Sequence, residues 1–163
     1  MAGNTSAKLI KSGYSSLTGE VPLDVAASFS VSGSAAQGTS VPATITPDPT
    51  QPAVTQSYVQ VPPDEYWLVY GVYSPVQTPA IDGYVQFVVN NKAQNITFGP
   101  LSQTYRNIFG YKSLSSTILA QPNSQIAPKL ITAAANTLTT AVSVKVNIEI
   151  KRLPQNYTGK IVA

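Results

Sequence analysis

The stretch VSVKVNIEIK, residues 142–151, decides the fold class of this chain. Its apolar residues occupy every second position, and the residues between them are polar: Ser143, Lys145, Asn147, Glu149 and Lys151. A period of two is typical of a β-strand that has one face in the protein core. Ten residues at about 3.3 Å each span about 33 Å. The pattern predicts a long strand in which Val142 to Ile150 form the internal face of a sheet.

Similar segments recur towards the N-terminus. In DVAASFSVSG (24–33) the larger apolar residues share one face, whereas EYWLVYGVYS (65–74) is apolar on both faces and is expected to be covered on both sides. YVQFVVNN (84–91) is rich in β-branched and aromatic residues, which favour strands. PNSQIAPKLIT (122–132) contains Pro128, so we expect an edge strand or a bulge there. The Pro-rich segment 40–54 is expected to be an extended connection.

The spacing of these segments indicates an all-β protein. Eight to ten short strands with turn signals about every ten residues are typical of a sandwich or barrel. A chain of 163 residues favours one domain. We predict a single eight-stranded jelly-roll sandwich or barrel at residues 21–153, an extended N-terminal arm at 1–20 and a C-terminal tail at 154–163. An immunoglobulin-like sandwich of about 100 residues would leave much of the chain unexplained.

Composition restricts the chemistry that is open to this chain. Charged residues are 10% of the sequence and the net charge is +3, so the surface must be largely neutral and polar. Such a surface suits a protein that lies against copies of itself. Cysteine and histidine do not occur, which removes the usual general base, the commonest transition-metal ligand and the strongest nucleophile. We therefore predict no enzyme, with no catalytic residue, no metal and no cofactor.

The carboxylates give no contrary signal. Asp64 and Glu65 are adjacent, and neighbouring side chains on a strand point to opposite faces, so the two cannot converge on one substrate atom. We interpret them as the entry from a loop into a strand. Asp24, Asp48, Asp82 and Glu149 are expected in turns or on a solvent face.

Aromatic residues concentrate in the middle of the chain. Trp67, Tyr70, Tyr73 and Tyr84 would form a sugar-binding groove if they lay together, but a core with a subunit interface is the favoured interpretation. Basic residues are scattered, which argues against specific nucleic-acid binding. The first residues lack a secretory h-region, and no apolar run approaches about 18 residues, so we expect synthesis in the host cytoplasm.

The order of strand and turn segments along this chain resembles that of the single jelly-roll capsid proteins of icosahedral viruses, particularly those of thermophilic archaeal and bacterial viruses with an internal membrane. The resemblance covers about residues 21–153 and depends on VPPDEYWLVYGVYS (61–74), PNSQIAPKLI (122–131) and VSVKVNIEIK. It implies capsomers built from an upright barrel, terminal arms that tie neighbours together, other capsid proteins as partners and an underlying viral membrane.

The sequence thus predicts a structural virion protein that assembles with itself into a capsid. Its expected assembly residues are Lys8, Leu9 and Ile10 in the arm, with Trp67, Tyr70 and Tyr73 divided between the core and the surface between subunits. Two alternatives stay open at this point. One is a glycan- or receptor-binding module such as a fibre head or adhesin, and the other is a pilus-like subunit that is assembled by strand donation.

Overall fold

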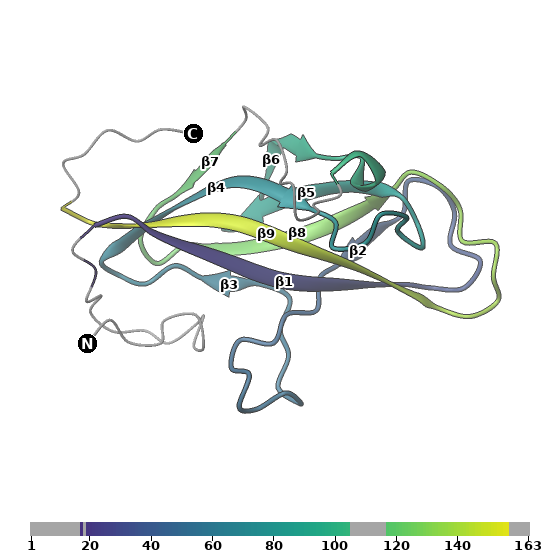
Figure 1. Cartoon of the computed structure of the whole chain (residues 1–163), viewed down its shortest axis with the longest axis horizontal. Coiled ribbons are helices and arrows are strands. Elements are labelled where there is room, and N and C mark those ends of the chain that lie inside the picture. Colours follow the sequence, from purple (N-terminus) through teal and green to yellow (C-terminus); the bar gives the residue numbers. More distant parts are fainter. Residues whose placement is uncertain (1–16, 18, 105–116, 157–163) are drawn as a thin grey trace.

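The computed structural model describes residue 17, residues 19–104 and residues 117–156, and within them the protein is an all-β sandwich of two antiparallel sheets (Figure 1). Sheet A has the strand order β1 (Val21–Val31), β9 (Val142–Pro154), β4 (Glu65–Tyr73) and β7 (Ile118–Ala120). Sheet B has the order β2 (Ser40–Pro42), β8 (Gln125–Thr132), β5 (Gly83–Val89) and β6 (Lys92–Phe98), and β3 (Val59–Gln60) also pairs with β8. The short 3-10 helix η1 (Leu101–Gln103) follows β6.

Strand β9 lies between β1 and β4, and its alternation is the one that the sequence predicts. Val144, Val146, Ile148 and Ile150 are buried in the core, while Ser143 and Lys145 are exposed. The pairing of β9 with β1 runs without a register shift from one end of β1 to the other. Because side chains alternate on both strands, the apolar face of β1 faces the same core.

Strand β4 departs from simple alternation. The register with β9 shifts between Val69 and Gly71, so that Tyr70 is the extra residue of a β-bulge. Trp67, Val69 and Val72 consequently face the core together. Strict alternation would have placed Val72 on the opposite face from Trp67. Leu68, on the outer face, is also buried, but Tyr66, Tyr70 and Tyr73 are only half-buried, so the prediction that both sides are covered is confirmed at Leu68 alone.

Strand β8 is a central strand, so the prediction of an edge strand around Pro128 is wrong. It pairs with β5 on one side and with β2 and β3 on the other. The carbonyl of Pro128 accepts a hydrogen bond from the N–H of Ala43, which shows that the backbone of Pro128 faces the gap between β2 and β3. The missing N–H of the proline therefore costs no hydrogen bond to β5.

The Pro-rich segment also contributes more to the sheets than the sequence predicts. Pro42 belongs to β2, and the next residues form isolated bridges from Thr44 to Ser28 of β1 and from Ile45 to Gln56. Val41, Ala43 and Ile45 are buried. The chain between β2 and β3 projects away from the sandwich as a long loop (Figure 1). This edge position is where a sheet tolerates proline.

Two loops run side by side beyond the end of the sandwich opposite to the place where β1 begins (Figure 1). They are residues 32–39 and residues 133–141, and the buried side chain of Asn136 joins them. Its Nδ2 donates to the carbonyls of Ser32 at 2.9 Å and Thr140 at 3.1 Å, and its Oδ1 accepts from the N–H of Leu138 at 3.0 Å. Gly33 lies so close that a Cβ atom there would be 2.2 Å from the Thr139 carbonyl oxygen.

Replacing Asn136 with Ala should destabilise the protein by about 1–3 kcal/mol, because the partly buried hydrogen bonds to Ser32 and Thr140 are lost and the two loops are no longer joined. The free energy of unfolding from urea titration measures the effect. Asn95→Ala, at an exposed position of β6, is the matched control and should change it by less than about 0.5 kcal/mol. Equal effects of the two substitutions would contradict the role given to Asn136.

Candidate functional site

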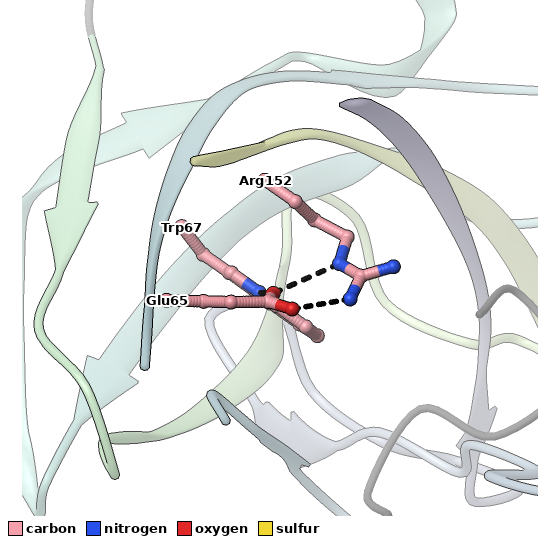
Figure 2. A network of polar contacts seen from close by, with 3 residues as sticks. All are labelled: Glu65, Trp67 and Arg152. Carbon is pink, nitrogen blue, oxygen red and sulfur yellow. Dashed lines mark hydrogen bonds and ion pairs between the residues drawn. The ribbon is translucent and has the colours of Figure 1, made fainter. Parts of the chain in front are cut away.

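A polar cluster lies in the interior of the sandwich near the beginning of β4 (Figure 2). Glu65, the first residue of β4, accepts from Trp67 Nε1 at 2.7 Å and from Arg152 Nε at 2.9 Å. Arg152 Nη2 donates to the other carboxylate oxygen, which completes a two-pronged ion pair. Trp67 and Arg152 are register partners on β4 and β9, so their side chains lie next to each other.

This cluster defines the role of Glu65, one of the two adjacent carboxylates. The side chain of Glu65 is 0% exposed, and each of its oxygens accepts from a cation, so it has no surface on which to meet a substrate. The interpretation as a strand entry holds for the backbone, since β4 begins at Glu65, but the ion pair was not predicted from the sequence. A signal was present, because Arg152 continues the apolar phase of Val144 to Ile150 with a charged residue.

Arg152 has N–H donors that the ion pair does not use. Among the described residues nothing accepts a hydrogen bond from its Nη1, which is buried and points away from Glu65 (Figure 2). A charged, bidentate pair offsets the loss of hydration only when its geometry is good. The cluster therefore has the properties of a structural ion pair that fixes β4 against β9.

The outer face of sheet A carries the accessible aromatic residues of β4. Tyr70 and Tyr73 are half-buried there. Lys151 of β9 places its Nζ 5.2 Å from the centre of the Tyr70 ring and 3.2 Å from Glu20 Oε1. Leu68 on the same face is buried, so the two tyrosines and Lys151 are the accessible part of this surface. Tyr is enriched at protein interfaces, whereas Lys and Glu are depleted there.

The outer face also brings two carboxylates together. Asp24 of β1 and Glu149 of β9 are register partners, and both point to the outer face because Val25 and Ile148 face the core. Glu149 is only 4% exposed, so the expectation that it lies on a solvent face is wrong. Two carboxyl groups on directly opposite residues of neighbouring strands would suit acid–base chemistry only if a substrate reached both. The burial of Glu149 prevents that approach.

The four aromatic residues considered for a sugar-binding groove do not converge. Trp67 is 1% exposed and lies in the core, whereas Tyr70 and Tyr73 lie on the outer face of sheet A. Tyr84 belongs to β5 in sheet B and is 39% exposed. Side chains on different layers of a sandwich cannot stack on one ligand. Of the aromatic residues that were predicted to take part in assembly, Trp67 is thus a core residue, and Tyr70 and Tyr73 lie at the surface.

Lys8, Leu9 and Ile10 lie outside the described residues. In the described part of the chain no three acidic residues gather in a way that would hold a metal ion. Among the same residues no helix has the length and hydropathy to cross a membrane.

A second polar cluster stabilises the end of sheet B. Asp82 precedes β5, and its Oδ1 accepts from the N–H of Gly83 at 2.9 Å and of Ser102 at 3.0 Å. Its Oδ2 accepts from Ser102 Oγ at 2.6 Å. Burial raises the pKa of Asp82, but these hydrogen bonds to the charged form together outweigh it and hold the pKa below its usual value. The carboxylate therefore attaches η1 to the beginning of β5.

Comparison with known proteins gave no match, either to a family model or to a curated protein sequence.

Removing one partner of the buried pair should be far more damaging than removing both. Glu65→Leu or Arg152→Met alone should cost about 3–5 kcal/mol, because an unpaired charge is left in the core, and the double variant should recover most of this loss. Chemical denaturation of the four proteins gives the coupling energy. The exposed pair supplies the control, since Glu20→Gln should cost less than about 1 kcal/mol. Additive losses in the double variant would contradict the assignment.

Asp82 should make stability depend on pH in the acidic range. Its pKa is lowered on folding, so its contribution is complete above the unfolded value of about 3.9 and is lost as pH falls through the folded value. Asp82→Asn should therefore be less stable than the native protein by about 1 kcal/mol at pH 7, after allowance for solvent screening. The difference should shrink as the pH falls below about 4 and the carboxylate is protonated. Thermal melts across this range test it, and Ser102→Ala should show a smaller loss in the same window.

Proposed function

We propose that this protein is a structural capsid subunit with a jelly-roll fold that assembles with itself into a closed shell. The observation that carries the proposal is the nesting of the strand pairs. β1 pairs with β9, β2 and β3 pair with β8, β4 pairs with β7, and β5 pairs with β6. The first strand thus meets the last, and each later pair lies inside the one before.

This nesting is what results when one long antiparallel ribbon is rolled into two sheets, which is the jelly-roll arrangement. The pairs of β9 with β4 and of β8 with β5 close the roll. If β2 and β3 are counted as one strand that the projecting loop interrupts, the roll has eight strands. The fold alone does not define a function, so the properties of the surface must distinguish between the functions that such a fold can serve.

The surface of the described residues favours assembly over the binding of one small ligand. Large exposed apolar side chains lie on separate elements around the molecule: Val54 in the projecting loop, Val76 after β4, Tyr84 on sheet B, Leu119 on β7 and Leu138 in the paired loops. A shell subunit has neighbours on several sides, and many weak contacts add up when copies are numerous. The low charge of the chain reduces repulsion between copies.

The proposal includes the predicted arm contacts and partners. Lys8, Leu9 and Ile10 are proposed to contact neighbouring subunits, and Tyr70 and Tyr73 are proposed to lie between subunits. Copies of the chain, other capsid proteins and an underlying viral membrane are the proposed partners, and the virion is the proposed location.

Assembly of the purified full-length chain tests this function. We expect closed particles or capsomers in light scattering after size exclusion and in negative-stain images. A variant lacking residues 1–19 keeps Glu20 with its ion pair to Lys151 and should give smaller species. The full-length variant Lys8→Ser/Leu9→Ser/Ile10→Ser is the matched control for arm length, and it should assemble as poorly as the truncated chain.

A monomer at every concentration would contradict the proposal, provided that melting temperatures show all variants to be folded. That result would favour the glycan-binding alternative, for which the half-buried Tyr70 and Tyr73 beside Asn147 are the specific observation. A glycan array probed with the native protein and with Tyr73→Ala would then identify the ligand class.

A further inference from the structure

Strand β1 presents the longest edge of either sheet. Its 11 residues pair with β9 on one side only. On the other side, the N–H and C=O of Ser28 bond to Thr44 at 3.0 Å and 2.7 Å. Because the register with β9 has no shift, the backbone groups of every second residue point the same way as those of Ser28. Asp24 and Ala26 therefore direct their N–H and C=O groups away from the sandwich.

These outward groups are available for pairing. Both residues are exposed, and within the described part of the chain no hydrogen bond engages them on that side. The free stretch ends at Pro22, which has no N–H, and at Ser28, which Thr44 occupies. The other edges offer less, since β7 and β2 have 3 residues each, β3 has 2, and β6 has an irregular register with β5.

We propose that β1 pairs antiparallel with β1 of a second copy, with Asp24 of each copy opposite Ala26 of the other. In this register the two-fold axis passes beside Val25, and every outward N–H and C=O of Asp24 and Ala26 gains a partner. The two A sheets then form one continuous sheet across the contact. Edge strands that remain open are the usual templates for such pairing.

The two neighbouring registers of this pairing are less favourable. A shift that puts Asp24 opposite Asp24 of the second copy would set like charges directly against each other. A shift the other way would put Asp24 opposite Ser28, whose backbone already bonds to Thr44. In the proposed register the carboxylate of Asp24 meets the small side chain of Ala26. This contact is one interface between copies within the proposed assembly, so it rests on the proposed function.

Charge at position 26 gives a test with a predicted sign. Ala26→Asp places a second carboxylate opposite Asp24 of the other copy, and Ala26→Lys places a cation there. In sedimentation of the full-length chain at low salt, we expect association about three- to tenfold weaker for Ala26→Asp and unchanged or tighter for Ala26→Lys. Ala26→Ser is the neutral control and should match the native protein. Equal association in all four proteins would overturn the proposal.

A disulfide tests the register itself. Directly opposite residues of a hydrogen-bonded pair have Cα atoms about 5.5 Å apart, within the range that a disulfide spans. The chain has no native cysteine, so Asp24→Cys/Ala26→Cys should form a covalent dimer on oxidation, seen on non-reducing gels. Each single variant should form much less, because its cysteines lie on a diagonal of about 7–8 Å or more. Equal cross-linking by single and double variants would contradict the register.

The two proposals fail in different ways. If the native chain forms closed particles that Ala26→Asp leaves unchanged and the double cysteine variant stays monomeric on gels, the edge contact is wrong while the shell function stands. If the chain forms dimers with the predicted charge and disulfide pattern but no larger species, the edge contact stands and the shell function is wrong. A native chain that stays monomeric at all concentrations overturns both.

Discussion

The antiparallel pairing of β9 with both β1 and β4 is the constraint on which the rest of the sandwich depends. These strands come from the beginning, the middle and the end of the described chain, so their pairing closes the fold. It is also what buries Val144, Val146, Ile148 and Ile150 against sheet B. Their burial offsets the cost of bringing distant segments together. Short strands such as β7 and β3 add to a frame that these three establish.

The buried pair of Glu65 and Arg152 gives this frame a register. A slip of β9 by one residue against β4 would carry Arg152 to the outer face and leave the carboxylate of Glu65 in the core without a cation. Apolar side chains discriminate less sharply between neighbouring registers, because one branched residue replaces another. An uncompensated buried charge is far more costly. The bulge at Tyr70 serves the same alignment, since it returns Val72 to the core face.

The proposed function and the proposed edge contact depend on what this frame leaves exposed. Sheet A ends at β1, whose outward backbone groups at Asp24 and Ala26 have no partner among the described residues. Most edge strands are protected by charge, proline or irregularity. Here Pro22 and the Thr44 bridge limit the open stretch instead of removing it, and a limited stretch allows few registers. An assembly that must close without aggregating requires this kind of restriction.

The sequence alone determined the all-β class and the core faces of β1 and β9, because period-two alternation is a local property of the chain. It did not determine that Pro128 lies in a central strand, that Glu149 is buried or that Glu65 meets Arg152. Each of these depends on which strands become neighbours, and no local pattern encodes that choice. Arg152 was visible as a charged residue in an apolar phase, but its partner lies 87 positions away in the chain. Only the tertiary structure decided the pairing, because only folding brings the two strands within hydrogen-bond distance.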